Sequence, residues 1–150
     1  MDETDRKILR VLQKHPEMSV VELAETVGLS QTPCWRRLKK LEEGGIIQRR
    51  NIVLDQNALG LSVNIFAHVR LKQHDEETLE ALEQAARDLP EILECFSMSG
   101  ESDYLFRIVA ASIEEYERFL KKVLLHLPGV AAVNSSFALK SVKITTDLPI

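Results

Sequence analysis

Residues 19–47, SVVELAETVGLSQTPCWRRLKKLEEGGII, decide the fold of the first third of the chain, because they predict two short helices joined by a tight turn. Ser19 and Glu22 have the spacing of a capping box, so the first helix is expected to begin at Val20. Gly28 is expected to end this helix, since a left-handed backbone conformation costs little only for glycine. A second helix then begins within a few residues.

The second helix is predicted to carry its positive charges on one side. Ser30 or Thr32 can cap its start, and Pro33 is tolerated in a first turn. At 100° per residue, one face is apolar and is expected to be buried: Cys34, Leu38 and Leu41. The opposite face is polar or charged: Thr32, Arg36, Lys39, Lys40 and Glu43. This arrangement is typical of a helix-turn-helix that reads DNA.

Seven residues of the second helix are our candidates for contact with DNA: Gln31, Thr32, Trp35, Arg36, Arg37, Lys39 and Lys40. Residues 31–50 hold six Lys and Arg against two Asp and Glu, although the whole chain has a formal net charge of −4. A helix with a basic outer face is often merely solvated. A basic patch on an otherwise acidic chain, however, favours a local contact with DNA.

A third helix, over residues 2–14, is expected to complete a three-helix unit by burying Ile8, Leu9 and Leu12. Residues 46–55, IIQRRNIVLD, are predicted to be extended and to serve as a short wing and hinge. Arg49 and Arg50 lie in this segment, where they either reach phosphates or belong to a solvated connector.

From residue 61 the hydrophobic period changes to two, which predicts a half-buried strand over residues 61–71. The expected elements after it are a helix over 75–88, strands over 92–99 and 103–110, a helix over 113–125 and a last strand over 130–140. The order βαββαβ predicts a ferredoxin-like sandwich. We therefore expect an α+β chain with a helix-turn-helix domain over 1–50, a hinge strand or linker over 51–60 and a second domain over 61–150.

Catalytic and metal-binding motifs find no support in the sequence. Residues 100–103, GESD, are not a GxSxG nucleophile elbow, and there is no GxGxxG. The four histidines lack the spacing of metal ligands: His15, His68, His74 and His126. We expect no enzyme activity, no cofactor and no metal.

The composition predicts a cytoplasmic protein without a membrane partner. Cys34 and Cys95 lie far apart and form no CxxC motif, so nothing indicates disulfides. No run approaches the roughly 18 apolar residues of a membrane helix. The stretch MDETDRKILRVL, residues 1–12, is acidic and then amphipathic, unlike a signal or transit peptide.

The loop over residues 99–104 is a candidate binding site for a free amino acid. Consecutive backbone N–H groups at a turn can form a nest for a carboxylate. Asp103 can hold an ammonium group, and Met98 or Phe96 can offer apolar contact. A hairpin turn rich in small polar residues explains the same pattern, and the two readings remain open.

The motifs together resemble the Lrp/AsnC family of feast/famine transcriptional regulators over essentially the whole chain. The first half carries Asp2-xx-Asp5-xx-Ile8-Leu9, then LSQTPCWRR at 29–37 and LEEGGI at 41–46. The second half carries SGESDYL at 99–105 and SSFALK at 135–140. The resemblance implies a winged-type helix-turn-helix, a strand-forming hinge and an effector-sensing ferredoxin-like domain.

The resemblance also implies homodimers that assemble into octamers, a pseudo-palindromic DNA operator, and amino acids bound between dimers. The effector residues that it implies are Ser99, Gly100, Asp103 and Tyr104, together with Ser135 and Ser136. The variable pair Glu101-Ser102 leaves the effector open, and the tail resembles leucine-responsive members, so leucine or methionine is expected. Sirohaem decarboxylases, which are enzymes, resemble this family in both domains and are the alternative, although this chain lacks clustered histidines.

Overall fold

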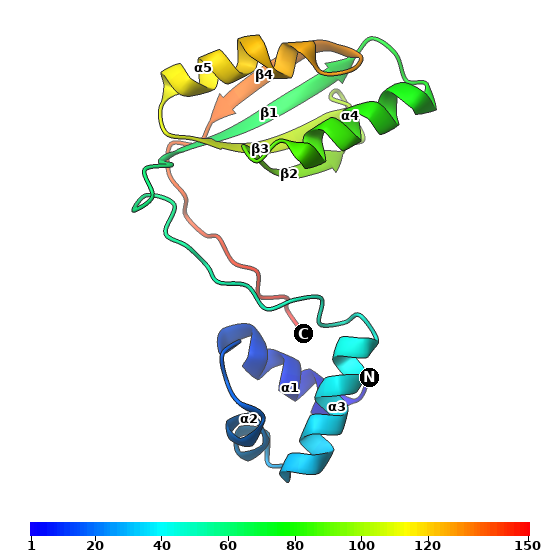
Figure 1. The fold of residues 1–150 in the computed structure, drawn as a ribbon, viewed down its shortest axis with the longest axis vertical. Coiled ribbons are helices and arrows are strands. Elements are labelled where there is room, and N and C mark those ends of the chain that lie inside the picture. The colour runs from blue at the N-terminus through cyan, green and yellow to red at the C-terminus, as the bar shows by residue number, and fades with distance from the viewer. The chain divides into compact units, whose positions relative to one another are not determined.

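The computed structural model describes residues 1–150, which divide into two units. One unit holds residues 1–54 and 143–150, and the other holds residues 55–142. Figure 1 draws the first as a group of helices and the second as a sheet with helices on one face. Each unit has its own hydrophobic core. None of the helices combines the length and the apolar character that crossing a lipid bilayer requires.

The helical unit confirms the three helices predicted from the sequence. They are α1 (Glu3–Lys14), α2 (Val20–Val27) and α3 (Gln31–Glu43). Their apolar stripes meet in one core, whose buried members are Ile8, Leu9, Leu12, Leu23, Ala24, Val27, Cys34, Leu38 and Leu41. The 3.6-residue period is therefore a sufficient guide to which side of each helix is buried.

The turn between α2 and α3 is built by local hydrogen bonds. The Ser19 side chain accepts from the Glu22 N–H, and the Glu22 carboxylate accepts from the Ser19 N–H, which confirms the capping box. Gly28 adopts the left-handed conformation at φ 75° and ψ 38° and closes the end of α2. Ser30 occupies the N-cap position of α3 but makes no side-chain capping bond.

Residues 46–62 form no strand, so the predicted hinge strand is absent from the single chain. The physical reason is that a strand is stabilised by pairing, and this segment has no neighbouring strand. Its one compact feature is a turn in which the Asp55 carboxylate accepts from the N–H groups of Asn57 and Ala58.

Residues 143–150 contact α1, which the sequence did not predict. The Gln13 side-chain amide accepts from the Leu148 N–H at 2.6 Å and donates to the Leu148 carbonyl at 3.2 Å. Arg10 donates to the carbonyl of Ile150, which packs against the helical core. This segment therefore belongs to the helical unit, although it follows the sheet unit in the sequence.

The sheet unit confirms the ferredoxin-like order. Its elements are β1 (Val63–Leu71), α4 (Glu76–Asp88), β2 (Ile92–Ser97), β3 (Tyr104–Ala110), α5 (Ile113–Lys122), a 3-10 turn (Leu124–His126) and β4 (Val130–Phe137). The sheet is antiparallel, with strand order β2-β3-β1-β4. The strands are a few residues shorter than predicted, because pairing stops before the alternating pattern does.

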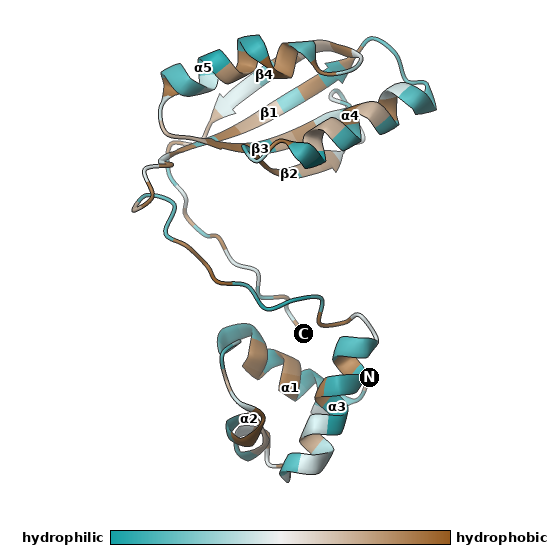
Figure 2. Ribbon diagram, in the orientation of Figure 1, coloured by the Kyte–Doolittle hydropathy of each residue, from teal (hydrophilic) through white to brown (hydrophobic).

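The alternation along β1 separates a buried face from an open face. Ile65, Ala67 and Val69 are fully buried beneath the helices. Phe66 and Arg70 are exposed and alternate with these residues, so they lie on the other face, which no helix covers in Figure 1. Figure 2 shows that β1 and β3 are hydrophobic over much of their length.

Candidate DNA-binding surface and effector site

The predicted DNA contacts lie on one face of α3. Six of the seven candidates are exposed, namely Gln31, Thr32, Trp35, Arg36, Lys39 and Lys40. Their positions follow from the burial of the opposite stripe of α3, which holds the helix against α1 and α2. The result is a polar helix face that the rest of its unit does not cover.

Two cationic side chains on this face have no ion-pair partner within the chain. Arg36 and Lys40 are four residues apart, so they are neighbours on the helix surface, and neither makes an ion pair within the chain. Lys39 lies 5.1 Å from the centre of the Trp35 ring and 3.6 Å from the Glu43 carboxylate. Phosphate groups can therefore reach Arg36 and Lys40 without breaking an existing contact.

Arg37 is placed differently from the other candidates, because its guanidinium contacts two carboxylates at the start of α1, those of the N-cap residue Asp2 and of Asp5. Its Nη1 lies 2.6 Å from Asp2 Oδ2 and 2.7 Å from Asp5 Oδ1. From the sequence, these aspartates are known only as members of the predicted helix over residues 2–14 and of the family motif. Arg37 follows Asp2 by 35 positions and Asp5 by 32 positions in the sequence. No local periodicity connects residues so far apart, so sequence reasoning missed the pairing.

The two arginines that follow α3 also differ from each other. Arg50 donates to the Pro16 carbonyl at 3.2 Å and lies 3.4 Å from the Glu42 carboxylate. Arg49 is exposed and makes no such contact. Of the two, Arg49 is therefore the one free to reach a phosphate, and Arg50 holds the connector to the helical unit.

The loop between β2 and β3 is a closed hairpin joined to β1. The Met98 N–H donates to the Asp103 carbonyl at 2.9 Å, and the Asp103 N–H donates to the Val69 carbonyl at 2.8 Å. Met98, Ser99 and Gly100 are exposed. Gly100 has φ +114°, which a residue with a side chain rarely adopts. The loop is therefore a hairpin turn whose exposed residues remain open to a ligand, so the two interpretations do not exclude each other.

The Asp103 carboxylate already has partners within the chain. Its Oδ2 accepts from the Leu71 N–H at 2.7 Å, and its Oδ1 lies 2.9 Å from His74 Nε2. The bond from Leu71 is the main cause that lowers the pKa of Asp103, with His74 adding to it. Each oxygen keeps a lone pair, so a ligand ammonium group can still bind, but the first role of this side chain is structural.

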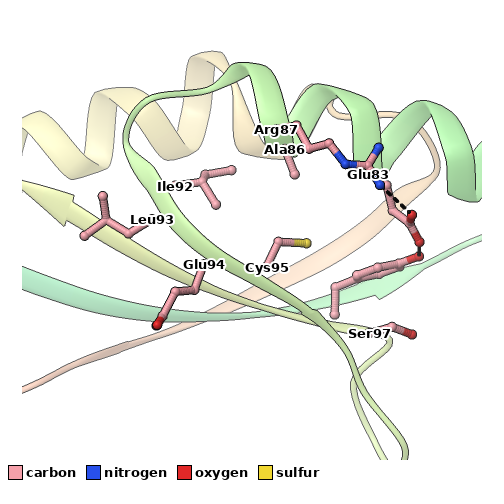
Figure 3. A pocket seen from close by; sticks show the side chains of 9 residues that line it. Glu83, Ala86, Arg87, Ile92, Leu93, Glu94, Cys95 and Ser97 are labelled. Atoms are coloured by element: carbon pink, nitrogen blue, oxygen red, sulfur yellow. Dashed lines mark hydrogen bonds and ion pairs between the residues drawn. The ribbon is translucent and has the colours of Figure 1, made fainter. Parts of the chain in front are cut away.

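Tyr104 lines a cavity beside α4 and β2 (Figure 3). Its hydroxyl donates to the Glu83 carboxylate at 2.7 Å, and burial of the residue together with this bond raises the pKa of Tyr104 to about 12. The cavity has a volume of about 460 Å³, within the range of small-molecule pockets. It is lined by Glu83, Ala86, Arg87, Ile92, Leu93, Glu94, Cys95, Ser97 and Tyr104.

Ser135 and Ser136 are not brought next to this loop in the single chain. They lie on β4, and β1 separates β4 from β3. Ser135 faces the helices, where its hydroxyl bonds the Tyr116 hydroxyl, whereas Ser136 pairs with Phe66 on the open face. Of the predicted effector residues, Met98, Ser99, Gly100 and Asp103 lie together in the loop, whereas the Tyr104 side chain reaches Glu83 of α4.

Comparison with known proteins assigns both units. Residues 64–148 match the family model of the Lrp/AsnC ligand binding domain, and residues 1–48 match that of a winged helix-turn-helix DNA-binding domain. The first match alone covers more than half of the chain. The chain therefore belongs to the Lrp/AsnC family of transcriptional regulators.

Relatives of known name or structure are similar over the full length of the chain. The DNA-binding transcriptional activator DecR of Escherichia coli K12 is 39% identical over 150 residues, which are 100% of this chain and 99% of DecR. The crystal structure of transcriptional regulator NMB0573 from Neisseria meningitidis, in complex with L-Met, matches with TM-score 0.95 and 38% identity over 99% of this chain and 96% of that one.

An AsnC family transcriptional regulator from Agrobacterium tumefaciens has TM-score 0.94 and 42% identity, over 99% of this chain and 97% of that one. These matches confirm the predicted fold and the two-domain organisation of a DNA-binding regulator with a ligand-binding domain.

Proposed function

We propose that this chain regulates genes of amino-acid metabolism by binding a pseudo-palindromic DNA site as a homodimer, under the control of an amino acid. The observation that carries the proposal is the uncovered face of α3, where Arg36 and Lys40 have no partner within the chain. That face belongs to a unit with its own core, joined in one chain to a ligand-binding domain. A cytoplasmic location is part of the proposal.

The proposed effector site is the loop of Met98, Ser99, Gly100, Asp103 and Tyr104, with Ser135 and Ser136 supplied across a subunit contact. The exposure of Met98 to Gly100 supports a site that is complete only between subunits. Methionine or leucine is the proposed ligand. The complex of NMB0573 with L-Met supports this choice, because that protein is similar over 96% of its length.

The open face of the sheet supports dimerisation, with octamers as the larger assembly. On this face, Phe66 of β1 is 36% exposed and Phe96 of β2 is 50% exposed. Leu105 lies on β3, the strand between β1 and β2. A sheet face that no helix covers and that exposes large apolar side chains is a surface that a second sheet can cover. We expect Phe66→Asp to yield monomers by light scattering at micromolar concentration, whereas Leu139→Asp, at a fully exposed residue outside the sheet, leaves the assembly intact.

The DNA test uses a duplex selected in vitro by the wild-type protein, compared with a random duplex of equal length. Arg36→Ala is expected to weaken binding to both duplexes and to lower the log–log salt slope by about one, the signature of a lost phosphate contact. Unchanged affinity would remove Arg36 from the interface. A wild-type protein that prefers neither duplex would contradict sequence-specific binding.

The alternative, an enzyme resembling sirohaem decarboxylases, has a separate test. The relatives named above are regulators, which disfavours it. A purified protein with a Soret band, or one that acquires a band on titration with a tetrapyrrole, would support the enzyme reading. We expect neither result.

A further inference from the structure

Arg37 and the start of α1 form a three-residue ion cluster inside the helical unit. One guanidinium nitrogen of Arg37 bridges Asp2 at 2.6 Å and Asp5 at 2.7 Å. Asp5 is the more enclosed aspartate, with 13% of its side chain exposed. The cluster therefore ties the middle of α3 to the first turn of α1.

In each aspartate, one carboxylate oxygen caps α1 and the other contacts Arg37. Asp2 Oδ1 accepts from the Asp5 N–H, and Asp5 Oδ2 accepts from the Asp2 N–H, both at 2.9 Å. These two bonds make the capping box of α1, while the remaining oxygens bind Arg37. The cap and the ion cluster thus use different atoms, so a substitution can separate them.

The electrostatics favour this arrangement over a free arginine. Carboxylates at a helix N-terminus are stabilised by the aligned peptide dipoles, and a cation beside two of them relieves their mutual repulsion. The bond from the Asp5 N–H and then Arg37 lower the pKa of Asp2, while Asp2 and then Asp5 raise the pKa of Arg37. Moving Arg37 to a DNA phosphate would leave both carboxylates without their cation.

Arg36 and Arg37 are neighbours on α3 but have different surroundings. Arg36 is exposed and unpaired on the outer face. Arg37 lies 100° further around the helix, at the border of the buried stripe. Two consecutive arginines of the same motif therefore meet different surroundings, and the identity of the residue alone does not give its role.

We propose that Arg37 is a positioning residue: through Asp2 and Asp5 it fixes the rotation of α3 against α1, so that the outer face of α3 meets the DNA bases in register. This inference rests on the proposed DNA binding and assigns Arg37 no contact with DNA. Ion pairs that stay partly open to water, such as that of Arg37 with Asp2, add little to stability, so the expected effect is on the geometry of recognition.

The sharpest test replaces the aspartates by Asp2→Asn and Asp5→Asn. An asparagine oxygen can still accept the capping bond, but the amide cannot hold the guanidinium. General electrostatics predicts that removing a negative charge strengthens DNA binding. We expect the opposite on the selected duplex, a loss of about tenfold, comparable to one base contact, with undiminished affinity for the random duplex.

Glu3→Gln is the matched control, because Glu3 lies in the same first turn and pairs with Arg10 instead of Arg37. It removes the same charge from the same end of α1 and should leave the preference for the selected duplex unchanged. Thermal melting checks that each variant folds. If Asp5→Asn does not fold, Asp2→Asn decides alone, since Asp2 is the more exposed partner.

A double-mutant cycle completes the test. Arg37→Met should lose the preference for the selected duplex without lowering the salt slope, and adding Asp2→Asn should cost nothing more. The proposal is overturned if the aspartate variants bind the selected duplex as tightly as wild type, or if Arg37→Met weakens both duplexes equally and lowers the slope by about one. Either result leaves sequence-specific binding by the wild type untouched.

Discussion

The helical unit and the sheet unit gather their functional residues in different ways. In the helical unit the candidates are neighbours on one helix, from Gln31 to Lys40, so the helical period groups them without knowledge of the fold. In the sheet unit they come from a hairpin loop and from β4, with β1 between them. A site on one helix can be predicted from sequence, whereas a site between segments needs the assembled protein.

Long-range partners show the same difference at the level of single residues. Asp103 bonds Leu71 and His74, and Arg37 pairs with Asp2 and Asp5 at the start of α1. Each of these side chains carries a charge that a local pattern assigns to a ligand or to DNA. In the folded chain, each of these side chains already has a partner within the chain.

The largest expected effect tests whether the two cores are independent. Leu23 and Leu82 are fully buried in the helical and the sheet core, respectively. Leu23→Ala and Leu82→Ala should each cost about 3 kcal/mol in the unit that holds the leucine. Calorimetry should therefore show one transition lowered and the other unmoved in each variant. A common shift of both transitions would mean that the units unfold together.

A smaller effect is expected at Gly129, which directly precedes β4 and lies against Thr78 of α4. It has φ +71°, and an added Cβ would lie 2.3 Å from the methyl group of Thr78. Strain and overlap together should cost about 2 kcal/mol or more for Gly129→Ala. Gly60→Ala is the control, since Gly60 has φ +77° but open space around it, and should cost about 1 kcal/mol. Equal losses would refute the contact with Thr78.

Ser135 gives a test of about 1 kcal/mol that separates structure from ligand binding. Its hydroxyl bonds that of Tyr116 in the covered face of the sheet. Ser135→Ala and Tyr116→Phe should each destabilise the sheet unit by about 1 kcal/mol, and their effects should not add. If Ser135→Ala instead keeps full stability but loses effector binding in calorimetry, Ser135 serves the ligand alone.

The smallest expected effect is a loss of stability in acid. The pKa values of Asp103, bonded by Leu71, and of Asp75, bonded by Thr78, are lowered in the folded sheet unit. An aspartate whose pKa is lower in the folded state stabilises the fold at every pH above its pKa in the unfolded chain, which is about 4. This stability is lost as the pH falls below that pKa. Asp103→Asn should flatten this loss in urea titrations, and Glu101→Gln, at an exposed loop residue, should not.

Much of the fold follows from the sequence because its signals are local. The capping box of Ser19 and Glu22, the helix end at Gly28 and the alternation along β1 each depend on residues close together in the sequence, and the structure has them as predicted. The hinge strand over 51–60 could not be settled this way, since a strand needs a partner. The contact of Leu148 with Gln13 joins residues 135 positions apart, and no sequence pattern indicates it.

The central claim is that an amino acid bound to the sheet unit changes DNA binding by the helical unit. Fluorescence anisotropy of the in vitro selected duplex, titrated with the wild-type protein in each of the twenty amino acids, tests it directly. We expect methionine or leucine to change the Kd by about fivefold or more, the usual size of coupling between two sites. An unchanged Kd in all twenty amino acids would contradict the claim.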